Sequence, residues 1–256
     1  EIAKRAGVME NMPNVLSMAL GAGETSLIDL TAAYASFVNG GKKVEPSLID
    51  RIQDRRGKNI FLENFAACTN CDEPYIEENP MPKLVNSSES IFDEAKSYQM
   101  VSILKGAVDR GTGRKTKIDG IEIAGKTGTT NNNTDAWFIG FTSDLIIGVY
   151  AGFDKPKSLG KRETGSSVAV PIFRDFVKNY YQEKPILPFT IPNGIELIKI
   201  NYDTGEIASN FNSSESVYEA FSKSDNLVSS GEILVGSEGF QIIEVADEVM
   251  EEYVIY

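Results

Sequence analysis

The sequence predicts an α+β fold in which helices pack against an antiparallel sheet. Residues 135–141 and 145–153 have the composition of two strands, and the polar residues 142–144 between them indicate a hairpin turn. Apolar residues recur at helical spacing in three other stretches, residues 27–41, 94–108 and 168–181. The prediction depends on this combination of a hairpin with amphipathic helices before and after it.

Composition excludes several classes of chemistry. The 256 residues are 41% hydrophobic and 24% charged, which is ordinary for one large globular domain or two small ones. Lys and Arg number 25 against 37 Asp and Glu, and the net charge of -12 argues against a nucleic-acid partner. The chain has no histidine, which excludes Ser-His-Asp catalysis and His-ligated zinc. We therefore expect no metal and no cofactor, and chemistry that uses Lys, hydroxyls, carboxylates and backbone amides.

The first predicted helix covers residues 27–41. Ser26 is placed to cap its start, and the two glycines at 40–41 end it. Residues 43–52 have an extended pattern, and a turn at 54–57 leads into a second extended stretch at 59–61.

Residues 63–95 are polar and proline-containing, and we expect a surface insertion there. It holds both cysteines, Cys68 and Cys71, in a single CxxC. Two cysteines without histidine are too few ligands for a structural zinc site, so a short disulfide and a pair of free thiols both remain open.

The next helix, residues 94–108, presents one apolar face and ends at the glycines of 111–113. That face consists of Tyr98, Val101, Leu104 and Val108. Residues 118–125 alternate apolar and polar side chains, which predicts a strand exposed on one side.

The last predicted helix, residues 168–181, opens near Pro171. Its expected apolar face consists of Ile172, Phe173, Phe176, Val177 and Tyr180.

Beyond Pro185 the composition changes, so we divide the chain into a core domain, residues 1–184, and a C-terminal extension, residues 185–256. The extension contains a strand–turn–strand pattern that turns at residues 203–205. Residues 210–231 are rich in Ser and Asn and are expected to be disordered.

The sharpest local motif is Lys126-Thr-Gly-Thr-Thr130, directly after a predicted strand. An ammonium flanked by hydroxyls on an exposed strand edge can receive a carboxylate, and Gly128 lets an extended substrate approach that edge. An amide beyond the glycine can donate to a developing oxyanion. The alternative interpretation is an ordinary solvated strand end followed by a turn.

The same residues also satisfy the P-loop pattern, because Gly120, Gly125, Lys126 and Thr127 fit G-x-x-x-x-G-K-[ST]. A P-loop opens a helix, whereas Gly-Thr-Thr-Asn-Asn-Asn is a poor helix start. Nucleotide binding is therefore a remote alternative.

Wider context identifies a family. The run AGKTGTTNNNTDAWFIGFTSDLIIGVYAGFD resembles the third active-site motif and following strands of class A, bifunctional penicillin-binding proteins. So do ALGAGETSLIDLTAAYASFVNGGKKVEP, RGTGRK and ETGSSVAVPIFRDF, in family order over about residues 14–182. The resemblance implies a β-lactamase/transpeptidase-like fold, incomplete at its N-terminus, and the C-terminal part of a D,D-transpeptidase domain.

The resemblance also implies roles and partners. Lys126, Thr127, Gly128 and Thr129 are expected to bind the substrate, which in this family is a peptidoglycan stem peptide or a β-lactam. The family also implies a glycosyltransferase domain upstream, a membrane anchor outside this chain, and a place on the periplasmic side of the bacterial inner membrane. The remaining N-terminal part of the same protein is then a partner of this chain.

The family nucleophile lies in S-x-x-K, and a second motif in S-x-N, both well before the stretch that matches here from residue 14. Residues 1–13 contain neither. Ser102, Ser158 and Ser224 begin look-alikes that we attribute to chance. The chain alone is therefore expected to be inactive, either as one portion of a transpeptidase or as a non-catalytic remnant or scaffold.

Five residues near the motif have structural interpretations. We expect Asp135 to hold a turn and Trp137 to fill the core against the helices. Two interpretations apply to Arg110, Arg114 and Lys115: they attract acidic glycan peptides, or they belong to a solvated turn.

Overall fold

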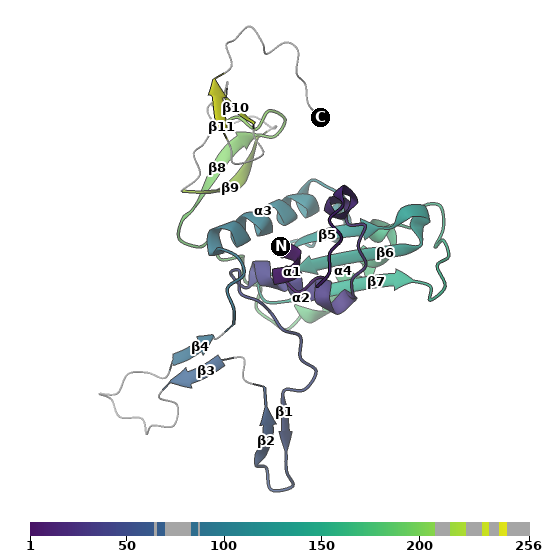
Figure 1. Ribbon diagram of the computed structural model, residues 1–256, viewed down its shortest axis with the longest axis vertical. Coiled ribbons are helices and arrows are strands. Elements are labelled where there is room, and N and C mark those ends of the chain that lie inside the picture. Colours follow the sequence, from purple (N-terminus) through teal and green to yellow (C-terminus); the bar gives the residue numbers. More distant parts are fainter. Residues whose placement is uncertain are drawn as a thin grey trace, which may run out of the picture. The chain divides into compact units, whose positions relative to one another are not determined.

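The computed structural model describes residues 1–63, 66–69, 83–86, 88–207, 216–223, 232–235 and 241–244; for 66–69, 83–86, 232–235, 241–244 and Asn131 it describes the backbone (Figure 1). Its helices are α1 (Ile2–Arg5), α2 (Leu27–Val38), α3 (Glu94–Asp109) and α4 (Val170–Tyr180), with short turns η1 (Leu16–Leu20), η2 (Arg114–Thr116), η3 (Asn131–Asn133) and η4 (Gly165–Ala169). Its strands are β1 (Arg51–Gln53), β2 (Asn59–Leu62), β3 (Ala66–Thr69), β4 (Lys83–Asn86), β5 (Ala124–Thr129), β6 (Asp135–Phe141), β7 (Ile146–Gly152), β8 (Ile195–Asn201), β9 (Ser216–Ser222), β10 (Glu232–Val235) and β11 (Gln241–Glu244).

Contacts divide the chain into two compact units, residues 1–192 and 193–256. The boundary at 184/185 between core domain and C-terminal extension, which was placed by composition, stays a prediction.

The centre of the first unit is an antiparallel sheet in the order β5-β6-β7, as the hairpin pattern predicts. Lys126 pairs with Ile139 across β5 and β6. The predicted strand at 118–125 is wrong over residues 118–123, because β5 begins at Ala124. Ile118 bridges to Ile121 around Gly120, whose φ of 81° is a turn conformation, so the alternation there belongs to a tight turn.

Helix α4 covers one face of this sheet (Figure 1). Its buried residues are Val170, Phe173 and Val177, which pack with Phe138 and Val149 of the sheet. This i, i+3, i+7 stripe is narrower than the predicted face.

Two residues of the predicted α4 face lie beside that stripe. Ile172 and Phe176 are each 54% exposed, so their assignment to the core face is wrong. Each precedes a buried residue and is therefore rotated by about 100° around the helix from it. The helix also begins later than predicted, at Val170, because Gly165–Ala169 form a wider π-type turn.

Helices α2 and α3 cover the other face. Val101 and Leu104 of α3 pack with Ala124 and Phe141 of the sheet and with Phe189. The predicted face of α3 is confirmed for its three aliphatic members, since Val108 is buried as well.

The predicted cap of α2 is confirmed. The Ser26 hydroxyl accepts a hydrogen bond of 3.1 Å from the Asp29 amide. At the start of α3 the Asp93 carboxylate plays the same part for the amides of Ala95 and Lys96.

Two antiparallel strand pairs, β1–β2 and β3–β4, lie in the described parts of residues 51–86. The turn predicted at 54–57 is present, and the Asp54 carboxylate accepts from the amides of Arg56 and Lys58 there. Cys71 lies outside the described residues, and the structure describes only the backbone of Cys68, in β3, so the disulfide and the pair of free thiols both stay open. Much of the insertion predicted at 63–95 also lies outside the described residues.

In the second unit, the predicted tight hairpin at 203–205 is only partly right. Ile200 does form a bridge to Ile207, but β8 pairs along its whole length with β9, from Ile195–Ser222 to Asn201–Ser216. Part of the stretch expected to be disordered is thus a strand, because a seven-residue partner satisfies more of the backbone of β8. Residues 208–215 and 224–231 lie outside the described part of the chain.

Candidate functional site

The motif residues lie inside an edge strand. Lys126, Thr127, Gly128 and Thr129 all belong to β5, which pairs with β6 on one side and with no other described strand on the other. The strand is followed by the single turn η3, in which Asn132 has a φ of 62°. No helix opens after Thr127, so the backbone has none of the N-terminal amides that a P-loop needs.

The backbone of β5 presents amides at its open edge. Thr130 N donates a hydrogen bond of 3.2 Å to the Asp135 carbonyl oxygen, which fixes residue 130 as facing β6. Successive residues of an antiparallel strand face opposite sides, so the amides of Thr127 and Thr129 face away from β6. These are the positions from which an amide can donate to a substrate oxygen.

Lys126 is exposed, and its ammonium curls back to donate a 3.0 Å hydrogen bond to the Thr127 carbonyl oxygen. That carbonyl also belongs to the open edge. The positive charge is therefore held beside the strand edge and not inside the core.

Gly128 stands opposite Trp137 in the register. A Cβ at this position would lie 3.2 Å from the Trp137 Cβ, a distance tighter than ordinary contact. A side chain at residue 128 would therefore crowd Trp137 of the neighbouring strand, in addition to hindering the approach of a substrate to the open edge of β5.

The Thr127 hydroxyl has a partner that the sequence motif does not include. Its Oγ1 lies 2.7 Å from Oγ1 of Thr112, in the turn after α3. Thr112 lies in the run RGTGRK, which the sequence analysis assigned to the family without predicting a contact with Thr127.

The Thr129 hydroxyl also has a partner, because Oγ1 accepts a 3.1 Å hydrogen bond from the amide of Gly165. Its own proton remains available to another acceptor. The segment before α4 is thereby joined to the last residue of β5.

A hydrogen-bonded cluster ties down the end of the hairpin between β5 and β6. The Asp135 carboxylate accepts from Tyr150 (2.8 Å), Thr134 (3.1 Å) and Thr130 (3.2 Å). The Tyr150 hydroxyl, followed by the two threonines, holds the pKa of Asp135 below its usual value, although desolvation opposes this. The same bond raises the pKa of Tyr150. The turn-holding part that we expected of Asp135 matches this geometry.

Trp137 does not fill the core, contrary to the sequence-based expectation. It is half-buried on the face of the sheet that also carries Lys126, and its ring packs edge-on against Tyr150 with 4.9 Å between ring centroids. The core positions of β6 are its neighbours Ala136 and Phe138, which are fully buried.

These residues line a groove of about 610 Å³. One wall is the sheet face with Lys126, Trp137 and Tyr150, and the other is the stretch from Leu20 to Tyr34, which includes the start of α2. The groove combines a cationic, hydroxyl-bearing edge with an aromatic and aliphatic wall. Its described lining residues include no serine.

The serines of the three look-alike motifs lie elsewhere. Ser102 is on α3, and the lysine of its motif, Lys105, is ion-paired with Glu122 at 2.5 Å. Ser158 lies in an exposed loop and accepts a 3.2 Å hydrogen bond from Gly160 N. Ser224 lies outside the described residues.

Glu122 also anchors the segment after α4. Its carboxylate accepts a 2.9 Å hydrogen bond from Phe189 N in addition to the contact with Lys105. Burial would raise the pKa of Glu122, but the hydrogen bonds from Lys105 and Phe189 outweigh it and lower the pKa. Lys105 is thus committed to a structural contact.

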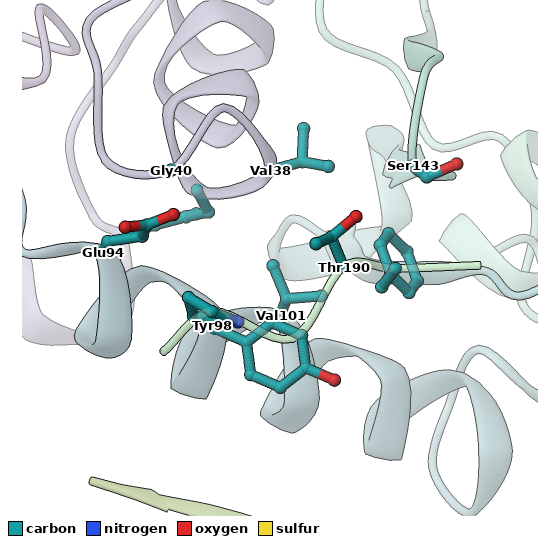
Figure 2. Close-up of a pocket in the computed structure, with 10 residues that line it drawn as sticks. Val38, Gly40, Glu94, Tyr98, Val101, Ser143 and Thr190 are labelled. Carbon is teal, nitrogen blue, oxygen red and sulfur yellow. The ribbon is translucent and has the colours of Figure 1, made fainter. Parts of the chain in front are cut away.

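A second hollow, of about 130 Å³, lies between the end of α2, the start of α3 and the turn between β6 and β7 (Figure 2). Glu94, Tyr98, Ser143 and Thr190 contribute its polar groups. It shares no residue with the groove and has no lysine, so it offers no receptor for a carboxylate. Among the described residues, no group of three or more acidic or Cys side chains could hold a metal ion.

Comparison with known proteins identifies the family. The penicillin binding protein transpeptidase domain matches residues 4–178. Penicillin-binding protein 1A of Rickettsia conorii is 46% identical over 213 residues, which are 81% of this chain and 26% of that protein. Penicillin-binding protein 1A of Rickettsia typhi is 39% identical over 259 residues, covering 99% of this chain and 32% of that protein. The chain thus spans between about a quarter and a third of the length of these relatives.

Solved structures of penicillin-binding proteins are also similar to this chain. The crystal structure of penicillin-binding protein 1A from Haemophilus influenzae has a TM-score of 0.69 and 28% identity, over 84% of this chain and 35% of that one. The penicillin-binding protein PonA1 from Mycobacterium tuberculosis, at 21% identity, a TM-score of 0.58 and coverage of 73% and 50%, shows the fold alone. The predicted β-lactamase/transpeptidase-like α+β fold is confirmed. With the family domain matched over residues 4–178, the chain belongs to the transpeptidase domain family of the class A penicillin-binding proteins.

Proposed function

We propose that this chain supplies the substrate-recognition strand of a peptidoglycan D,D-transpeptidase that cross-links stem peptides and binds penicillin. The observation that carries the proposal is β5, an edge strand whose residues Lys126, Thr127 and Thr129 line the 610 Å³ groove. A terminal carboxylate of a peptide or of a β-lactam fits this edge by charge and by hydrogen bonding.

In the proposed reaction, a serine attacks the penultimate D-alanyl carbonyl and its proton passes to a nearby lysine. D-Alanine leaves, and the amine of a second stem peptide attacks the acyl-enzyme. Lys126 supplies positive potential beside the serine and the substrate carboxylate. The Thr129 amide, which faces the open edge, supplies half of the oxyanion hole.

The nucleophilic serine, in this proposal, comes from a part of the protein outside residues 1–256. Two observations support this: the described lining of the groove has no serine, and Lys105 of the Ser102 motif is already paired with Glu122. The relatives are three to four times longer than the stretch matched here, so they have room for such a segment.

We further propose that the site works on the periplasmic side of the bacterial inner membrane, with its anchor and a glycosyltransferase domain in that other part. Stem peptides are found on that side. Among the described helices, none has both the length and the apolar character to cross a bilayer.

The test compares the complete gene product with residues 1–256 alone, each incubated with labelled penicillin and mapped by mass spectrometry. We expect a covalent adduct on the complete product, on a serine outside this chain, and none on residues 1–256. An adduct on Ser102 or Ser158 would disprove the placement of the nucleophile. No adduct on the folded complete product would instead favour a non-catalytic remnant or scaffold.

A further inference from the structure

We propose that Thr112 is a positioning residue, which orients the hydroxyl of Thr127 toward the substrate carboxylate. The proposal rests on the function proposed above and adds a residue outside the Lys126-to-Thr130 motif. Its starting point is the 2.7 Å contact between the two Oγ1 atoms. The contact is exposed to solvent, and its two residues are 15 positions apart in the sequence.

The turn that carries Thr112 is held firmly against α3. Gly113 N donates a 3.0 Å hydrogen bond to the Ala107 carbonyl oxygen. A Cβ on Gly111 would lie 2.9 Å from that oxygen, and one on Gly113 would lie 3.1 Å from it. The two glycines therefore let the turn lie flat on the end of the helix, and Thr112 between them has little freedom to move.

Helix α3 in turn packs along β5, through Val101 and Leu104 against Ala124. The distance between Thr112 and Thr127 is thus set by the core and not by the flexibility of an exposed loop. A preorganised hydroxyl costs less ordering free energy when the substrate arrives.

Either hydroxyl can be the donor in this contact, and the proposal takes Thr112 as the donor. When Thr112 donates to the oxygen of Thr127, the Thr127 proton is left for an outside acceptor. A hydroxyl that already accepts a hydrogen bond is a stronger donor itself. Lys126 beside Thr127, and Arg114 two residues after Thr112, make an anionic acceptor the favoured one.

An exposed pair of hydroxyls has little reason to exist for stability alone, because water serves each hydroxyl nearly as well. The effect of removing Thr112 should therefore appear in acylation and not in unfolding. This separates a positioning role from a merely structural one.

The test uses the complete protein and measures the rate of acylation by benzylpenicillin. Thr112→Val should lower this rate by about 5- to 10-fold, the usual loss for one hydrogen bond between uncharged groups. Thr112→Ser keeps the hydroxyl and should stay within about twofold of the parent. Thr190→Val, an exposed threonine outside the site, is the matched control and should leave the rate unchanged.

A double-mutant cycle provides the decisive measurement. If Thr112 acts through Thr127, then Thr112→Val should slow acylation no further in a Thr127→Val background. Losses that multiply would overturn the proposal, as would a parental rate in Thr112→Val or failure of the serine variant to rescue. A parental protein that is not acylated at all would overturn the proposed function and this inference with it.

Discussion

The amide of Gly165 donates a 3.1 Å hydrogen bond to the hydroxyl of Thr129, so the turn before α4 supports the last residue of β5. The backbone of Gly165 lies close to the strands, because a Cβ on Gly165 would be 2.4 Å from the Trp137 carbonyl oxygen and 2.7 Å from that of Gly128. A position 36 residues away in the sequence thus fixes the strand that carries Lys126.

Gly165→Ala should therefore destabilise the domain and displace β5. The new methyl group meets two backbone oxygens that cannot rotate away, and overpacking of this kind typically costs about 1–3 kcal/mol. Urea unfolding of the complete protein measures the loss. Ser166→Ala, next to it, is the control and should have little effect; equal stability of Gly165→Ala and the parent would show that the turn yields easily.

Lys126→Ala should slow acylation of the complete protein by penicillin strongly, by about 10²–10³-fold, with the melting temperature nearly unchanged. Lys126 is exposed and supports little packing, whereas its charge acts on the substrate carboxylate and on the serine. Lys126→Arg should recover part of the rate, since it keeps the charge but changes the reach. Thr127→Val should cost less than Lys126→Ala. A parental acylation rate in Lys126→Ala, or simple unfolding, would refute the role assigned to this residue.

Tyr181 should make stability depend on pH in the alkaline range. Burial, with the hydrogen bond that its hydroxyl donates to Asp144, raises the pKa of Tyr181 from 10.0 to about 12. The unfolded chain then releases this proton at lower pH than the folded one, so the contribution is full below pH 10 and is lost as pH rises toward 12. The stability difference between the parent and Tyr181→Phe, measured by urea unfolding, should shrink from pH 9 to pH 11. A constant difference would mean that Tyr181 ionises equally in both states.

ATP and GTP should not bind. Lys126 and Thr127 lie within β5, and the residues that follow form one short turn in place of a helix. Millimolar nucleotide with magnesium should leave the melting temperature of the chain unchanged. A clear rise would restore the P-loop interpretation of residues 120–127.

The sequence by itself determined those features that arise from local periodicity and from motifs. The cap of α2 at Ser26 and the hairpin of β6 and β7 are determined by residues close together in the sequence, so helix propensity and turn chemistry predict them. The family, too, was evident from residues in family order around Lys126. Where local patterns were ambiguous, as in the alternating residues 118–123, the sequence did not distinguish a turn from a strand.

Only the tertiary structure decided which face of each element is covered and which distant residues meet. Alternation along β6 places Trp137 and Phe138 on opposite faces, but α4 buries Phe138, whereas Trp137 remains at the groove. The contacts of Thr127 with Thr112 and of Thr129 with Gly165 join residues 15 and 36 positions apart. Such contacts depend on how α3 and α4 pack against the sheet, and packing is a property of the whole domain that no local stretch of sequence encodes.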